Sequence, residues 1–265
     1  MDSREDVRLG VSAIGQRLSA KSSAVLLQLQ TRLDRIMLLW LLLAALASAA
    51  RIALSPVKVP FAVEVILPYV LLVLAPVASM VLALRWFADG EQQPQPRVRL
   101  AVIGRWRKIE ADEARGNALY GAGGIMVSLL VGMLLNVPIR ALEYFGAMPA
   151  VSGQVPAWLA VLHMMMTLDV VVISSLYAVA FVAALRHAPL FPRLLVAIWA
   201  LDLTMQLFTA QLVAGTPGLP SIVADPLRDL LDGNVKKVLI SVGLWLPYLL
   251  MSKRVNVTYR HRVVG

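Results

Sequence analysis

Cysteine is absent from the 265 residues of this chain, so disulfide bonds, thiolate catalysis and cysteine-ligated metal sites are excluded. Charged residues are also scarce, because they make up 15% of the sequence, compared with about 25% in ordinary soluble domains. Hydrophobic residues account for 59% of the chain, and the mean hydropathy is +0.73. Such a chain is too apolar for a soluble domain, and we predict a multipass membrane protein.

The sequence also lacks the short motifs of several enzyme classes. It has no Walker loop, no dinucleotide fingerprint, and none of the patterns Gly-x-Ser-x-Gly, Gly-x-Gly-Asp and His-x4-Asp. No basic and aromatic module for nucleic acid accompanies the net charge of +9, because Lys and Arg gather between long apolar runs. That placement suits anionic lipid headgroups. We therefore expect no enzyme, no cofactor and no nucleic-acid partner.

Six apolar runs are long enough to cross a bilayer, whose core of about 30 Å needs roughly 20 helical residues. They cover about residues 36–54, 61–84, 119–141, 158–185, 190–214 and 235–251. About 35 mostly polar and basic residues precede the first run, so no cleavable signal peptide is expected. We predict an all-α fold, a polytopic membrane bundle of six transmembrane helices.

The distribution of positive charge predicts the orientation of these spans. With this segmentation, 19 of the 25 Lys and Arg residues fall on one side of the membrane. Because loops rich in Lys and Arg stay in the cytosol, both termini are expected to be cytosolic. The even number of spans agrees with that orientation.

Three segments are predicted to lie along the membrane surface. Residues 1–35 read as an amphipathic helix, either an interfacial foot or a helix that docks on a partner. Its apolar positions are Val7, Val11, Ile14, Leu18, Val25, Leu29 and Leu33, with Arg8, Arg17, Lys21 and Arg32 between them. Residues 85–117 form a basic cytosolic loop. On the opposite surface, Asp225 and Pro226 are predicted to open a short helix, since Asp is a good N-cap and Pro suits the first helical position.

Three stretches carry a resemblance to a known family. They are Gly121-Ala122-Gly123-Gly124, Leu190-Phe191-Pro192-Arg193-Leu194, and the closing string from Leu244 to Val255 followed by Thr258 and Tyr259. In these places the chain resembles the 2569 family of domains of unknown function, small bacterial inner-membrane proteins. The resemblance covers roughly residues 117–262 and implies a four-span bundle in the inner (cytoplasmic) membrane. It implies no catalytic residue, cofactor or partner.

Two acidic residues fall near the middle of predicted spans. Asp169 and Asp202 lie eleven or twelve residues into the fourth and fifth spans, at a similar depth of roughly 16 to 18 Å. A charged carboxylate there is costly, so each acid must face the bundle interior, carry a proton or have a partner. Gln206, one turn from Asp202, is the expected partner. The pair is either a structural polar contact or part of a proton or cation pathway.

Two other polar features have simpler interpretations. His163 is a further candidate for the intramembrane polar site and lies beside Met164, Met165 and Met166. The remaining histidines fall on the cytosolic side, so we predict no metal site, and packing explains the methionines. Arg140 and Glu143, at the outer end of the third span, are expected to form a solvated interfacial pair.

The third and sixth spans carry predicted contact surfaces. Small and polar residues recur every four positions at Gly124, Ser128, Gly132 and Asn136. This stripe favours close helix packing within the chain, or a dimer or heteromeric face as the alternative. At the end of the sixth span, Trp245 and Tyr248 with Lys253 and Arg254 are predicted to anchor the helix at the interface, and Pro247 to kink it.

The predicted organisation is an N-terminal helix (1–35), a two-span extension (36–84), a basic loop (85–117) and a four-span bundle (118–265). The favoured function is a non-enzymatic membrane subunit or accessory factor of a larger complex, or of a homo-oligomer. The alternative is a small transporter or proton or ion pathway that uses Asp169 and Asp202. A membrane-embedded enzyme is the third and weakest interpretation.

Overall fold

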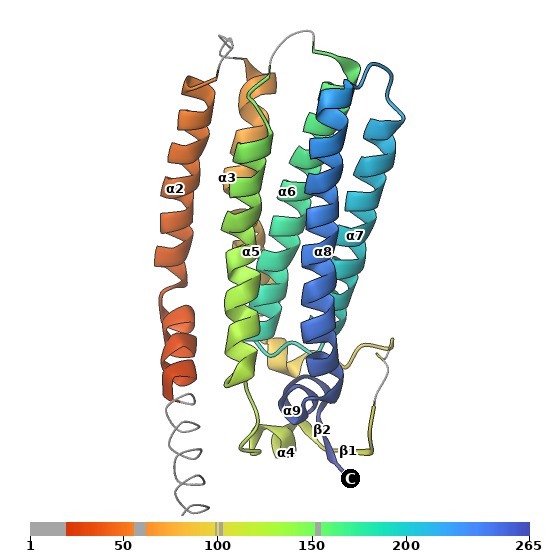
Figure 1. The fold of residues 1–265 in the computed structure, drawn as a ribbon. Coiled ribbons are helices and arrows are strands. Elements are labelled where there is room, and N and C mark those ends of the chain that lie inside the picture. The colour runs from red at the N-terminus through yellow and green to blue at the C-terminus, as the bar shows by residue number, and fades with distance from the viewer. Residues whose placement is uncertain (1–19, 56–61, 99, 101–102, 152–154) are drawn as a thin grey trace, which may run out of the picture.

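The computed structural model describes residues 20–55, 62–98, 100, 103–151 and 155–265. Six long helices pack side by side with alternating directions (Figure 1). They are α2 (Leu33–Ala53), α3 (Val63–Trp86), α5 (Ile125–Ala147), α6 (Ala157–Leu185), α7 (Phe191–Ala214) and α8 (Ser221–Met251). Each is long and apolar enough to cross a membrane, which confirms the predicted all-α bundle with six candidate spans.

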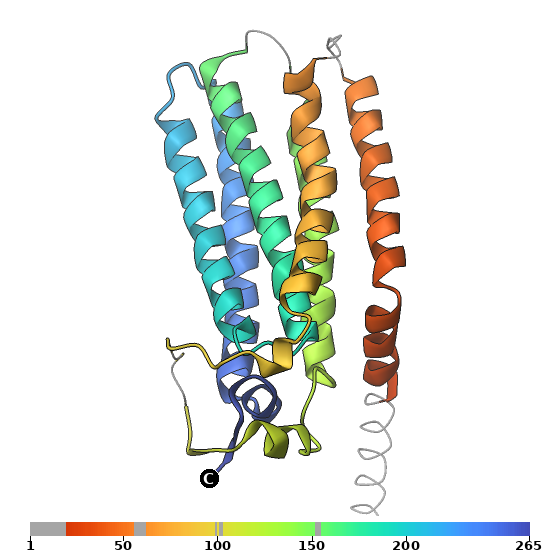
Figure 2. The same cartoon turned by 180° about the vertical axis from the view of Figure 1, so that it is seen from behind.

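Helix α6 is the centre of the bundle. In its most apolar 18-residue stretch 67% of the residues are buried, compared with 11% in α2. The helix is apolar on all sides, as a helix surrounded by other helices must be. Small residues, among them Ala180, Ala183 and Ala184, are completely buried on it. Its main neighbours are α3, α5 and α7, and Figure 2 shows α3 and α6 lying alongside each other.

Helix α2 stands at the edge of the bundle, against α3 and α5 (Figure 1). Most of its leucines are exposed, which suits a surface that faces lipid. One polar contact ties it to α3, because the Trp40 indole N–H donates to the Val73 carbonyl at 3.0 Å. That carbonyl lies next to the position where Pro76 lacks an amide hydrogen and interrupts the helical hydrogen bonds of α3.

Three predicted helix boundaries are wrong, and one of them is the end of α5, which lies at Ala147 and not at residue 141. Helix α5 begins at Ile125 and not at residue 119, because Gly121 (φ 97°) and Gly124 (φ 65°) adopt left-handed conformations that cannot start a helix earlier. Helix α8 begins at Ser221 and runs unbroken into the last span. Asp225 is therefore inside α8 and is not an N-cap, and no separate surface helix precedes the span among the described residues.

Most of the predicted amphipathic N-terminal helix lies in residues 1–19, outside the described residues. Residues 20–31 are helical, and this helix is interrupted at Arg32, the residue before α2 begins. Within this stretch Leu29 is buried against the core cluster, together with Leu33 of α2. The Ser22 hydroxyl accepts a hydrogen bond from the Gly124 amide at 3.3 Å, so this stretch also contacts the start of α5.

One end of the bundle is closed by a small folded unit, which we call the cap (Figure 1). It contains η1 (Gly90–Gln92), β1 (Trp106–Lys108), α4 (Ala111–Arg115), α9 (Lys253–Arg260) and β2 (Arg262–Val264). The two strands pair antiparallel, with Lys108 opposite Arg262. The cap joins the long segment between α3 and α5 to the last residues of the chain.

Helix α9 is the core of the cap. The Ser252 hydroxyl caps it by accepting a hydrogen bond from the Val255 amide, and residues from Val255 to Arg260 are buried. Tyr259 is fully buried and donates to the Ala184 carbonyl at the end of α6, at 2.8 Å. The segment that follows α8 is thus a packed part of the fold and not a free tail.

Candidate functional site

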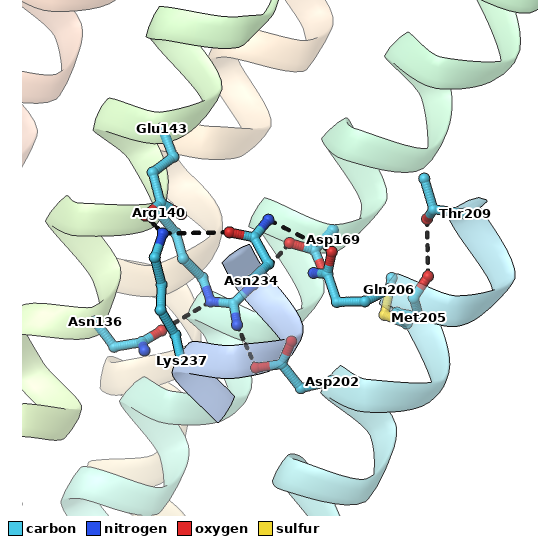
Figure 3. Close-up of polar contacts among 10 residues, drawn as sticks. All are labelled: Asn136, Arg140, Glu143, Asp169, Asp202, Met205, Gln206, Thr209, Asn234 and Lys237. Atoms are coloured by element: carbon cyan, nitrogen blue, oxygen red, sulfur yellow. Dashed lines mark hydrogen bonds and ion pairs between the residues drawn. The ribbon is translucent and has the colours of Figure 1, made fainter. Parts of the chain in front are cut away.

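An arginine joins the two acidic residues in the middle of the bundle (Figure 3). Arg140 of α5 donates from Nη1 to Asp169 Oδ2 of α6 at 2.7 Å, and from Nη2 to Asp202 Oδ2 of α7. Its Nε donates to Asn136 Oδ1, one turn earlier on α5, at 2.9 Å. Side chains on a helix lean toward its N-terminus, so Arg140 reaches from the end of α5 toward the middle of the bundle.

All three charged side chains of this cluster are buried. Their exposed fractions are 11% for Arg140, 8% for Asp169 and 0% for Asp202. With both carboxylates ionised, the cluster carries one more negative than positive charge. In addition, Asp202 Oδ1 is buried and has no hydrogen-bond partner within the described residues. An uncompensated charge in a low-dielectric interior is costly, so the cluster favours binding one proton or one cation.

Amide side chains extend the cluster to helix α8. Gln206 Nε2 donates to Asp169 Oδ1 at 3.0 Å, and Asn234 Nδ2 donates to Gln206 Oε1 at 3.4 Å. Lys237 donates to Asn234 Oδ1 at 3.3 Å and forms an ion pair with Glu143 of α5. The predicted partnership of Gln206 with Asp202 is wrong, because the Gln206 amide instead reaches Asp169 across the α6 and α7 interface.

A small cavity of about 50 Å³ opens beside the cluster. Its polar lining comes from Asn136, Arg140, Glu143, Asp202, Asn234 and Lys237. A water molecule occupies about 30 Å³ in the liquid, so the space suits one or two waters with several polar partners. The cavity extends from the Lys237 and Glu143 ion pair to the carboxylate of Asp202. It places a small, partly polar space next to Asp202, whose side chain is fully buried.

The expected solvated pair of Arg140 and Glu143 is wrong. Because α5 begins at Ile125 and ends at Ala147, Arg140 lies seven residues, or about 10 Å, inside its end. Glu143 pairs instead with Lys237. The need for charge compensation is the signal in the sequence that could have identified Arg140 as a partner of the two acids. Two acids in the middle of spans require a cation, and Arg140 lies on the same helix face as Asn136, four residues earlier.

The prediction that His163 belongs to this polar site is wrong. Its Nε2 lies 3.2 Å from the Tyr144 hydroxyl, which also contacts the Thr167 hydroxyl at 2.9 Å. Tyr69 packs edge-on against the Tyr144 ring. Among the described residues no three His, Cys, Asp or Glu side chains are grouped for a metal ion. His163 therefore belongs to a local polar contact between α5 and α6.

The predicted stripe of small residues is mostly exposed on the described part of the chain. Gly124 caps α5, and Ser128 and Gly132 are exposed. A Cβ atom added at Gly132 would meet no atom of the described residues within 4 Å. Larger side chains, such as Leu130 and Met133, form the buried face of α5. Only Asn136 faces inward, toward Arg140, and the dimer or heteromeric face stays a prediction.

The predicted interfacial anchor at the end of α8 has two different parts. Trp245 and Tyr248 form an edge-on aromatic pair with centroids 5.9 Å apart, and Lys253 is exposed. Arg254 has another role, because it is half-buried and donates to the Gly121 carbonyl at 3.3 Å. It therefore fixes the glycine-rich entry of α5 to the start of α9.

No family model, curated protein or solved structure matches this chain. The resemblance to the 2569 family of domains of unknown function therefore stays a prediction, and the site is interpreted from its geometry.

Proposed function

We propose that this chain is a multipass protein of a bacterial inner membrane, with both termini in the cytosol. The cap would then face the cytosol. The alternating helix directions support this orientation, because they place the segments that hold most of the Lys and Arg residues at the cap end. The Lys237 and Glu143 pair would lie on the opposite side of the Arg140 cluster from the cytosol.

Within that membrane, the geometry best supports a non-enzymatic role in moving or coupling a proton or a small cation. The excess negative charge of the Arg140, Asp169 and Asp202 cluster carries this proposal. Asp202 borders the cavity, and its Oδ1, which has no hydrogen-bond partner within the described residues, is the atom best placed to accept a proton. Arg140 would hold the two carboxylates in place while one of them changes its protonation state.

Proton flux into proteoliposomes under an imposed pH gradient tests this role. We expect Asp202→Asn to reduce the flux to the level of protein-free liposomes while the protein stays folded, because Arg140 keeps Asp169 as a partner. Asp232→Asn is the matched control, since Asp232 is an exposed acid of α8 and should leave the flux unchanged. A folded wild-type protein without flux above that background, or an unaffected Asp202→Asn variant, would refute the proposal.

A second candidate role is that of a membrane subunit or accessory factor. The place of α2 at the edge of the bundle favours it, because α2, α3 and α5 leave an apolar groove of about 260 Å³ between them. Ile36 and Trp40 of α2, Met80 of α3 and Leu134 of α5 line this groove. Purification in a mild detergent, followed by identification of co-purifying membrane proteins, tests this role. A monodisperse monomer without partners would count against it.

A further inference from the structure

The cap contains a cavity of about 280 Å³ with a strongly basic lining. Five of its lining residues are cationic: Arg97, Lys108, Arg193, Arg260 and Arg262. Gln95, Pro96 and Leu100 complete the lining, and no carboxylate takes part in it among the described residues. These side chains come from the loop after η1, from both strands, from the first turn of α7 and from α9. The fold thus brings cations from one loop, two strands and two helices together around one space.

Arg260 is the most deeply placed of these cations. It is 6% exposed, and its Nη1 donates to Asn256 Oδ1 at 3.1 Å. Its Nη2 is buried and has no hydrogen-bond partner in the part of the chain that the structure describes. A guanidinium group with one unused, desolvated donor edge is a specific donor for an oxyanion.

The surroundings of Arg260 disfavour its positive charge. Burial, together with the nearby positive charges of Arg193 and Arg262, lowers the pKa of Arg260 to about 10. Burial is the largest of these causes. The strand pairing adds a second like-charge contact, because Lys108 and Arg262 are directly opposite each other. Like charges at opposed strand positions are destabilising. An anion in the cavity would remove both repulsions.

The nearest acidic residues face a neighbouring cavity, which Lys108 and Arg260 also line. Arg107 of β1 forms an ion pair with Glu113 of α4 at 3.2 Å, and Glu110 and Glu113 border this second cavity beside His261. Arg107 is therefore neutralised within the chain, unlike Lys108, the next residue along the strand. Both residues line the second cavity, and of the two only Lys108 also lines the basic cavity.

We infer that the basic cavity of the cap is a binding site for a phosphate-bearing anion, held by Arg260 and Arg262 with Lys108, Arg193 and Arg97. The cavity is near the lower end of the range for small-ligand sites, so it suits a phosphate group and the polar atoms next to it. Such a group can belong to a soluble phosphate compound or to an anionic lipid headgroup. Both sources share the same chemistry at the arginines.

The thermal stability of the full-length protein in a neutral detergent tests this inference. In one arm, sodium phosphate is compared with sodium chloride at equal ionic strength. In the other arm, short-chain phosphatidic acid and phosphatidylglycerol are compared with phosphatidylcholine of the same chain length. We expect a saturable rise in Tm with phosphate-bearing anions, because a ligand that binds only the folded state stabilises it. A response in both arms indicates a soluble ligand, and one confined to the lipid arm indicates a headgroup.

Two variants remove the site. Arg260→Gln and Arg262→Gln should each weaken the apparent affinity at least about tenfold, since a hydrogen bond to a charged group is lost. Arg107→Gln is the matched control on the same strand and should keep the wild-type affinity. Arg262 is only partly buried, so its variant keeps the test decisive if Arg260→Gln does not fold. Equal effects of phosphate-bearing probes and their controls in both arms, or wild-type affinity in both site variants, would overturn the inference.

Discussion

Two buried arginines in this molecule have opposite electrostatic surroundings. Arg140, in the middle of the bundle, contacts two carboxylates, and its cluster has one excess negative charge. Arg260, in the cap, is influenced by two nearby arginines, and the basic cavity that it lines has no carboxylate among the described residues, whereas Glu110 and Glu113 border the second cavity that it also lines. The first site favours binding a proton or a cation, and the second favours binding an anion. Burial of an arginine therefore does not by itself determine which ion its site favours. The sign of the net charge around the arginine determines it, and this sign differs between the two sites.

Removal of Arg140 should have the largest effect on stability. Arg140→Gln leaves Asp169 and Asp202 buried without a cation, and the loss of one partner of a buried ion pair costs about 3 to 5 kcal/mol. We expect a large fall in Tm and in the yield of monodisperse protein. The triple variant that adds Asp169→Asn and Asp202→Asn should recover much of this loss, and no recovery would contradict the electrostatic explanation.

Loss of the contact between the cap and the bundle should have an intermediate effect. Tyr259→Phe removes the hydrogen bond to the Ala184 carbonyl, which still accepts the His187 amide at 3.2 Å, so we expect the cost of one net hydrogen bond, about 0.5 to 1.5 kcal/mol. Burial raises the pKa of Tyr259 well above its usual value of 10.0, so the hydroxyl is a neutral donor at physiological pH. Hydrogen exchange of the α9 amides should increase in this variant, and unchanged exchange would argue against a rigid cap.

The ion pair at the edge of the cavity should contribute less. Lys237 has an exposed side chain (59%), and exposed ion pairs contribute about 0.2 to 1 kcal/mol. Lys237→Gln should therefore shift Tm only slightly, because the amide can still donate to Asn234. A loss as large as that of Arg140→Gln would mean that the buried network extends to α8 as one unit. Thermal unfolding of the two variants in the same detergent makes this comparison.

The smallest change is expected for Arg260→Gln in phosphate-free buffer. The pKa of Arg260 is lower in the folded protein than in the unfolded chain, so the unfolded chain holds the proton more tightly. At neutral pH the buried charge therefore opposes folding, a penalty that lessens only as the pH rises through about 10. We expect the free energy of unfolding of this variant to stay within about 1 kcal/mol of that of the wild type, so its Tm should change little. A loss of several kcal/mol would show that Arg260 stabilises the cap without an anion.

The bundle was predictable from the sequence because apolar runs of sufficient length determine membrane helices. Asp169 and Asp202 were also found, since ionisable residues in the middle of an apolar run stand out. Arg140 was assigned incorrectly because hydropathy does not register the left-handed glycines that delay the start of α5. The cap was not predictable, because its contacts join distant residues, such as Tyr259 and Ala184, 75 positions apart.

The sequence separations within the Arg140 cluster set an order for assembly in the membrane. Asp169 and Asp202 follow Arg140 by 29 and 62 residues, so α5 is synthesised before either of its partners. An arginine alone in a bilayer costs about 2.5 to 3.5 kcal/mol on insertion scales. At about 5 to 20 residues per second, the 62 residues up to Asp202 take roughly 3 to 12 s to synthesise. We expect Arg140 to gain its first acidic partner when α6 arrives and its second when α7 arrives, so that insertion of α5 becomes more favourable in two steps.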